Sequence, residues 1–239
     1  MRAALVRPHA RIVTLALTKP QSRAQIIAAD PLGRFHVWWD DLTRGAVTRF
    51  QRQLVRARCE QDVQSFLERE PMLLIQHLGG GHGRWVIPRQ RLGAEHITDF
   101  VIGESCSSGF DWQAVELESP GARMFTRRGD PTASLTHAIR QIQDWRAWLG
   151  RNAGYAARSR AESGLGLTQI RADLPGLILI GRRGSVDPAT NERRRQMASD
   201  LNIRIHSYDY LLDNARGRMG WVTQNRKRQR EQRAKLRCS

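Results

Sequence analysis

The sequence has few cysteines and lacks a long apolar run, and both shortages narrow what the protein can be. Its 239 residues include only Cys59, Cys106 and Cys238, which lie far apart and form no CxxC pair. Three scattered cysteines make neither a disulfide scaffold nor a zinc knuckle, so we expect a reducing, cytoplasmic location. No apolar stretch approaches the roughly 20 residues of a membrane-spanning helix.

Acidic residues are also in short supply. Asp and Glu number 23 against 39 Lys and Arg, which gives a formal net charge of +16 and a pI near 11.3. Such a surplus is typical of proteins that bind a polyanion, nucleic acid first and an anionic membrane surface second. We therefore expect DNA as the partner and no membrane association. With 40% hydrophobic residues the chain is long enough to bury a core.

The amino terminus carries basic residues and no acid before Asp30. Arg2, Arg7 and Arg11 precede an apolar run over residues 12–17, which is shorter than the about 7–15 residues of a signal-peptide core. We interpret this stretch as an ordinary basic segment because it is poor in Ser. An organelle transit peptide is the alternative.

Half of the excess charge lies at the carboxyl end. Residues 216–239 hold nine basic residues and one acid, Glu231, a surplus of eight out of the chain's +16. Because few apolar residues accompany them, the segment is predicted to be a mobile or marginally helical basic tail. We expect it to bind DNA phosphates, with Arg226, Lys227 and Arg228 as candidate contacts, and a merely solubilising tail is the alternative.

Between the termini, strand patterns alternate with helix patterns. Strands are predicted over residues 35–40, 84–87, 96–103, 111–118, 176–181 and 203–207. Helices are predicted over 42–71 (one helix, or two joined end to end), 135–149, 191–201 and 208–212. Helices placed between apolar strands predict an α/β fold with a mixed central sheet flanked by helices.

Three carboxylates form the most informative pattern. Glu116 and Glu118 are two residues apart on a predicted strand and so project from the same face. Asp99 lies in the preceding strand, so an antiparallel hairpin would bring it beside Glu116. Like charges this close repel, and a divalent cation with oxygen ligands would cancel the repulsion. The alternative is a solvated sheet face, and spacing alone favours that alternative.

Several segments, taken in order, resemble one family. They are Asp99-Phe-Val-Ile, Trp112-Gln-Ala-Val-Glu-Leu-Glu-Ser-Pro120 and Ala138-Ile-Arg-Gln-Ile-Gln-Asp-Trp145, with supporting pieces over 64–71, 177–183 and 205–212. Together they resemble the carboxy-terminal domain of the Shedu anti-phage nucleases, of the PD-(D/E)XK nuclease superfamily. The resemblance covers about residues 60–212, and the chain divides into a 1–58 extension, a 59–215 nuclease domain and the 216–239 tail. It implies a restriction-endonuclease-like core and a DNA endonuclease that uses Mg²⁺ or Mn²⁺.

The resemblance implies roles for four residues. Asp99 and Glu116 would bind Mg²⁺, with the Leu117 carbonyl completing the shell, and Gln141 would orient DNA or water. Glu118 stands where the commoner motif has Lys, and it would bind a second metal or accept a proton from water. This departure leaves a catalytically inactive, nucleic-acid-binding relative as the alternative function.

Other basic residues and histidines receive smaller roles. Arg123 or Arg128 would supply the missing positive charge, and Arg182 and Arg183 would contact phosphate or else form a solvated turn. We expect His77, His82 and His137 to be structural or exposed rather than metal ligands. The resemblance also implies a possible homo-oligomer, in which the apolar stripe of residues 42–67 packs between subunits or covers the chain's own core.

Overall fold

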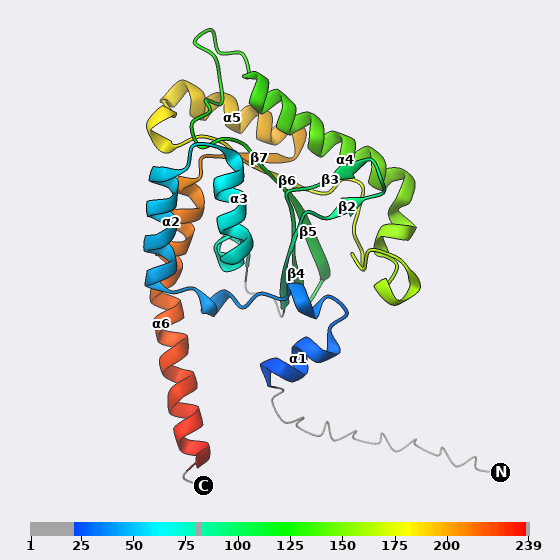
Figure 1. Ribbon diagram of the computed structural model, residues 1–239, viewed down its shortest axis with the longest axis vertical. Coiled ribbons are helices and arrows are strands. Elements are labelled where there is room, and N and C mark those ends of the chain that lie inside the picture. The colour runs from blue at the N-terminus through cyan, green and yellow to red at the C-terminus, as the bar shows by residue number, and fades with distance from the viewer. Residues whose placement is uncertain (1–21, 80–82, 238–239) are drawn as a thin grey trace, which may run out of the picture.

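A five-stranded mixed sheet forms the centre of the computed structural model, which describes residues 22–79 and 83–237 (Figure 1). The amino-terminal run over 12–17 and His82 lie outside these residues. The strands are β1 (Gly83–Pro88), β4 (Phe100–Cys106), β5 (Gly109–Leu117), β6 (Gly176–Leu179) and β7 (Ile203–His206), in the order β1-β4-β5-β6-β7. The pairs β1–β4 and β4–β5 are antiparallel, whereas β5–β6 and β6–β7 are parallel.

The predicted strand over 96–103 is interrupted. Its beginning pairs in a separate two-stranded ladder, β2 (Arg91–Leu92) with β3 (His96–Ile97), and only its end belongs to β4. Asp99 lies in the break, immediately before β4.

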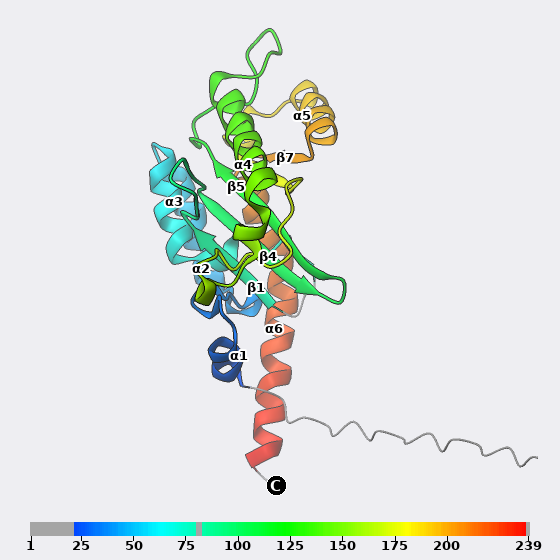
Figure 2. The same ribbon diagram turned by 90° about the vertical axis from the view of Figure 1, so that its right-hand side faces the viewer.

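Helices cover both faces of the sheet (Figures 1 and 2). On one face, α4 (Ala133–Ala157) and α5 (Pro188–Leu201) pack over one hydrophobic cluster. On the other face, α2 (Arg44–Arg56), α3 (Glu60–Arg69) and α6 (Asp209–Arg237) pack over a second cluster. The α/β fold class with a mixed, helix-flanked sheet is therefore confirmed, and it is consistent with a restriction-endonuclease-like core.

The apolar stripe over 42–67 forms two helices, not one. α2 begins at the Thr43 cap, whose hydroxyl accepts the Ala46 N–H at 3.0 Å, and the chain breaks between α2 and α3. Phe50 and Leu67 have 0% exposure inside the chain's own core. These residues of the stripe therefore cover the chain's own core, the alternative named above, and packing between subunits stays a prediction.

The prediction of a strand over residues 35–40 is wrong. Two short 3₁₀ turns, Gly33–Phe35 and Trp39–Asp41, occupy its ends, and His36 makes an isolated bridge to Trp85. Aromatic side chains are frequent in strands, but here they pack against neighbouring side chains without forming a strand. The Arg23 guanidinium, for example, lies over the Trp38 ring, 4.5 Å from its centroid. The helix before them, α1 (Arg23–Ala29), was not predicted.

The expectation that the basic tail buries little and is at most marginally helical is wrong for the residues that the structure describes. The segment continues the predicted 208–212 turn as one helix, α6, which ends at Arg237. Val222 is fully buried, and Arg218 donates to the Leu78 carbonyl at 2.7 Å, so the helix has tertiary partners that its composition does not reveal. Within the described ranges, no helix combines the length and apolarity needed to cross a bilayer.

Candidate active site

The hairpin of β4 and β5 brings two of the predicted carboxylates together. Phe100 pairs with Val115, so one further step of the register sets Asp99 across from Glu116. The Leu117 N–H donates to Asp99 Oδ2 at 2.8 Å and fixes this arrangement. From α3, Gln64 Nε2 donates to the other oxygen, Oδ1, at 3.2 Å. Asp99 is thus held from two sides with its carboxylate directed at the end of β5.

Burial makes ionisation of this pair costly. Glu116 is only 4% exposed, and burial, together with the charges of Asp99, Glu60 and Glu118, raises its pKa to about 10. Burial also raises the pKa of Asp99 to about 6, against the lowering effect of the Leu117 N–H. The two side chains hydrogen-bond to each other, so at neutral pH the Glu116 carboxyl keeps its proton and donates it to Asp99.

Gln141 reaches the pair from α4. Its Nε2 lies in close contact with Glu116 Oε1 and 3.4 Å from His137 Nδ1, one helical turn earlier. α4 begins at the Thr132 cap, which accepts the Leu135 N–H, and its buried apolar face packs on the sheet. The helix therefore presents His137 and Gln141 toward the end of β5.

Glu118 lies beside the pair, against α4. Its Oε1 is 3.4 Å from His137 Nδ1, and its backbone oxygen accepts the Tyr208 hydroxyl at 2.7 Å. Burial raises the pKa of Glu118, while the hydrogen bonds from His137 and Ser134 lower it. His137 was predicted to be structural or exposed. Its side chain is 54% exposed and yet is the direct partner of Glu118.

Sequence reasoning missed a fourth carboxylate, Glu60, at the first position of α3. Burial, together with the charges of Asp99 and Glu118, raises its pKa to about 7. Glu60 comes near Asp99 and Glu118 only because α3 packs against the sheet. The local sequence therefore carries no signal for its place in the site.

The donor set fits a divalent cation in part. Among the residues that the structure describes, no three His, Cys, Asp or Glu side chains are grouped closely enough to hold a metal ion. Of the three predicted carboxylate ligands, only Asp99 and Glu116 therefore form a pair. Glu118 contacts His137 instead. Mg²⁺ in proteins commonly binds one or two carboxylates and keeps water in its other coordination positions. The buried carboxylate pair would therefore supply enough protein ligands for Mg²⁺.

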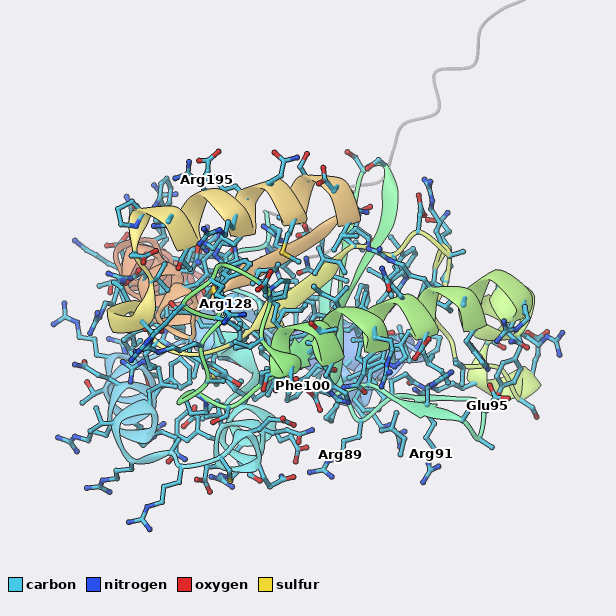
Figure 3. The ribbon with its side chains drawn as sticks, turned by 90° about the horizontal axis from the view of Figure 1, so that it is seen from above. Arg89, Arg91, Glu95, Phe100, Arg128 and Arg195 are labelled. Carbon is cyan, nitrogen blue, oxygen red and sulfur yellow. The ribbon has the colours of Figure 1, made fainter. Side chains whose placement is uncertain are left out.

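Exposed basic side chains lie on the segments that adjoin the carboxylate-bearing strands in sequence. Arg123 and Arg128 lie exposed on the loop before α4. Arg89 donates its backbone N–H to the Asp99 carbonyl at 2.9 Å. Seen from above, Arg89 and Arg91 point outward on the side away from α5 (Figure 3).

Arg182 and Arg183 are tied to α6. Arg182 Nε and Nη2 donate to Asp209 at 3.1 and 3.0 Å, and its Nη1 donates to the Leu54 carbonyl. Arg183 pairs with Asp213. Their predicted phosphate contacts stay a prediction, and for Arg182 the guanidinium already serves to join elements within the fold. Close by, Gly181 adopts φ +70°, and a Cβ there would lie 2.3 Å from the Ala122 carbonyl oxygen.

The three candidate tail residues lie on α6. Arg226 donates to the Asp40 backbone oxygen at 2.6 Å, whereas Lys227 and Arg228 are exposed. Their role in DNA binding stays a prediction.

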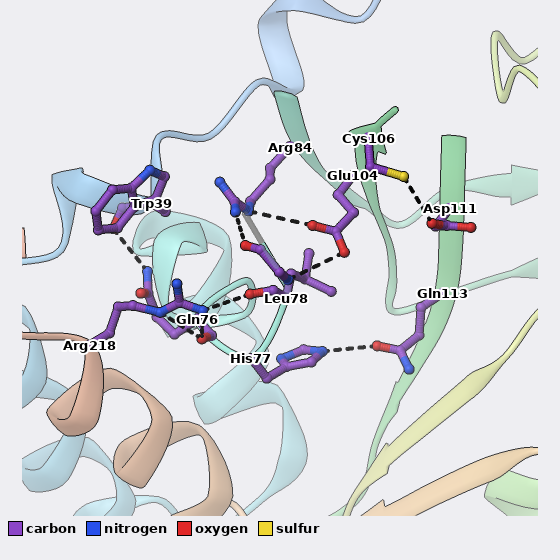
Figure 4. A network of polar contacts seen from close by, with 11 residues as sticks. Trp39, Gln76, His77, Leu78, Arg84, Glu104, Cys106, Asp111, Gln113 and Arg218 are labelled. Carbon is purple, nitrogen blue, oxygen red and sulfur yellow. Dashed lines mark hydrogen bonds and ion pairs between the residues drawn. The ribbon is translucent and has the colours of Figure 1, made fainter. Parts of the chain in front are cut away.

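A separate polar network lies toward the opposite end of β4 and β5 (Figure 4). His77 Nε2 contacts Gln113 Oε1 at 3.0 Å, and burial lowers the pKa of His77 to about 4. Glu104 Oε1 accepts the Gly79 N–H at 3.3 Å, and Arg84 contacts the Gly79 carbonyl. His77 is thus neutral at pH 7 and structural, and the second of these was one of the two roles expected for it.

Comparison with known protein families identifies the family of this chain. The family model described as Shedu protein SduA, C-terminal, matches residues 57–212, which include Asp99, Glu116, Glu118 and Gln141. No curated protein matches the chain significantly. The matched segment spans the sheet and its carboxylates, and it ends within the first turn of α6. The chain therefore belongs to the Shedu family through its C-terminal domain.

Proposed function

We propose that this protein is a metal-dependent DNA endonuclease of the PD-(D/E)XK type that hydrolyses phosphodiester bonds in anti-phage defence. The observation that carries the proposal is the buried Asp99–Glu116 pair at the end of β5, inside a chain of net charge +16. A protein gains no stability from burying two adjacent carboxylates, so a function for them is the better explanation. Membership of the Shedu family supports the same conclusion.

Asp99 and Glu116 are the residues that would hold Mg²⁺ or Mn²⁺. When bound, such a cation neutralises charge on the phosphate and activates water as a nucleophile. Asp99 is preorganised for this by Leu117 and Gln64, and Glu116 by Gln141. Glu116 must release its proton before it can act as a ligand.

His137 and Glu118 supply the proton chemistry next to the pair. A lysine would stabilise negative charge developing on the phosphate, and Glu118 at that position has no such capacity. Its contact with His137 provides an imidazole nitrogen 3.4 Å away, which donates or accepts a proton according to its charge state. Glu118 therefore orients His137, and His137 replaces the usual lysine.

The basic surface would hold the DNA. Exposed Arg123 and Arg128 lie on the loop before α4, and Lys227 and Arg228 on α6. Arginine and lysine at such positions neutralise phosphates and release counterions, so binding would weaken steeply as salt rises.

The proposal is tested by incubating supercoiled plasmid with the full-length protein and Mg²⁺ or Mn²⁺. We expect nicked or linear product from the wild type and at least about a hundredfold less from Glu116→Gln, the loss typical of a removed catalytic group. Asp111→Asn, at the other end of β5 where the side chain is exposed, is the matched control and should cleave normally. If folded, DNA-binding protein gives no product with either cation, the proposal fails.

A second candidate function is favoured by Glu118 itself. With glutamate in the lysine position, the domain would be a nucleic-acid-binding relative that has lost cleavage. That candidate predicts equal DNA affinity for the wild type and Glu116→Ala, and no cation binding that depends on Asp99.

A further inference from the structure

The inner side of α6 is fixed against the rest of the protein. Asp40, which is 4% exposed, accepts Asn225 Nδ2 at 3.0 Å and Gln229 Nε2 at 3.2 Å. Val222 is fully buried between these contacts and the Arg218 guanidinium, which donates to the Gln76 and Leu78 carbonyls. These bonds define which side of the helix faces inward over several turns, so its outer side is equally well defined.

Trp221 lies at the edge of the inward side, where the helix surface turns toward solvent. It is 69% exposed, the largest value for an aromatic residue in the described part of the chain. It borders a hollow of about 360 Å³, with Asn214 and Arg218 also in its lining. A Cβ placed on Gly217 or Gly220 would meet no atom within 4 Å, so the helix surface on either side of the indole is open. A flat aromatic face is thus presented to solvent by a helix that is anchored to the rest of the protein.

The charge beside Trp221 is positive. Arg228 follows seven residues later, so it lies on the same side of the helix, about 10 Å further along at 1.5 Å per residue. Lys227 and Arg230 are also exposed, on other sides of the same helix. An apolar protein partner would require this concentration of positive charge to be desolvated, whereas a nucleic acid is attracted by it.

An aromatic face next to basic side chains is the arrangement that binds unpaired nucleotides. Every base has a π-face that stacks on an indole, and the backbone phosphates pair with neighbouring cations. A base within a duplex is already stacked on both sides and is not available to Trp221. The combination therefore favours a single strand or an unpaired DNA end over an intact duplex.

We propose that Trp221 and Arg228 form a binding surface for unpaired DNA, in which a base stacks on the indole and a nearby phosphate pairs with the guanidinium. The surface is distinct from the carboxylates, because Trp221 lies twelve residues beyond the start of α6, about 18 Å along the helix. The inference rests on the proposed binding of DNA but does not require cleavage.

Binding of a fluorescently labelled oligothymidine to the full-length protein, followed by anisotropy in EDTA at fixed salt, tests this surface. Trp221→Ala should weaken binding about ten- to a hundredfold, the loss expected for one stacked base. Trp221→Phe keeps an aromatic face and should stay within about threefold of the wild type. Affinity for a blunt duplex of the same length should be the same for all three proteins. Because Trp221 is exposed, its loss leaves the core intact.

The matched control is Val55→Ala, which removes another exposed apolar side chain, 76% exposed on α2, and should change nothing. Equal oligothymidine affinity of the wild type and Trp221→Ala would overturn the inference. So would a drop in oligomeric mass caused by Trp221→Ala, because the indole would then contact a second copy. Plasmid cleavage by the same samples separates the two proposals. If plasmid is cleaved but Trp221→Ala binds oligothymidine as well as the wild type, only the binding surface is refuted. If Trp221→Ala binds oligothymidine more weakly but no sample cleaves plasmid, only the nuclease proposal is refuted.

Discussion

Asp99 accepts the backbone N–H of Leu117, the residue between Glu116 and Glu118, at 2.8 Å. This bond continues the β4–β5 register to the point where the two segments carry their acids. It places the carboxylate of one strand against the backbone of the other and leaves Glu116 to contact Asp99 through its side chain. The acidic site is therefore a property of the β4–β5 hairpin, to which the helices add Gln64, His137 and Gln141.

Stability should fall as pH rises when no divalent cation is present. The pKa of Glu116 is raised from 4.5 to about 10 and that of Glu60 from 4.5 to about 7, so the folded chain holds more protons than the unfolded chain at neutral pH. Their stabilisation is complete below about pH 4.5 and is lost progressively above it, by about 1.4 kcal/mol per pH unit for each extra proton held. Urea unfolding in EDTA across pH 7 to 9 measures this slope, above the range in which the buried His77 and His206 take up protons on unfolding. Glu116→Gln should flatten it, and an unchanged slope would contradict the assignment.

His137→Ala should slow DNA cleavage without weakening DNA binding. The imidazole contacts Glu118 and Gln141 and is assigned the proton transfer, so we expect kcat to fall about a hundredfold or more. His137→Lys should restore part of the rate because it returns a cation to the site. His96→Ala, on β3, is the control. Single-turnover cleavage measures the rate, and equal rates for wild type and His137→Ala would remove His137 from the mechanism.

Asp40→Ala should destabilise the fold by about 2–4 kcal/mol, because Asn225, Gln229 and Arg23 lose a buried acceptor. Asp41→Ala removes a 46%-exposed carboxylate that also pairs with Arg23, and should cost no more than about 1 kcal/mol. Chemical denaturation compares the two variants. Equal losses would show that Asp40 does not anchor α6.

Charge on α6 should control the salt dependence of DNA binding. Replacing Lys227, Arg228 and Arg230 by Gln should reduce the slope of log affinity against log salt by about 0.9 for each duplex phosphate that these side chains no longer neutralise. The matched variant replaces Arg52 and Arg56, exposed on α2, and should keep the slope. If the α6 variant kept the wild-type slope, the helix would not bind phosphate.

Much of the site follows from sequence, because it is local. Glu116 and Glu118 alternate with Leu117 on one strand, and a short turn before Gly109 makes the antiparallel partner the preceding strand. Glu60 could not be found this way, since its approach depends on the packing of α3. The packing of α6 against the protein was missed for a similar reason. Asn225 binds Asp40, 185 residues away, and no local pattern encodes such a contact.

The central claim is that Asp99 and Glu116 bind a divalent cation, and calorimetric titration with Mn²⁺ at neutral pH in two buffers of different ionisation enthalpy tests it most directly. The raised pKa of Glu116 means that binding must displace a proton. We predict saturable heat whose size depends on the buffer for the wild type, and no such heat for Asp99→Asn, in which the amide oxygen can still accept the Leu117 N–H. A wild type without saturable heat, or an Asp99→Asn variant that binds equally well, would contradict the account.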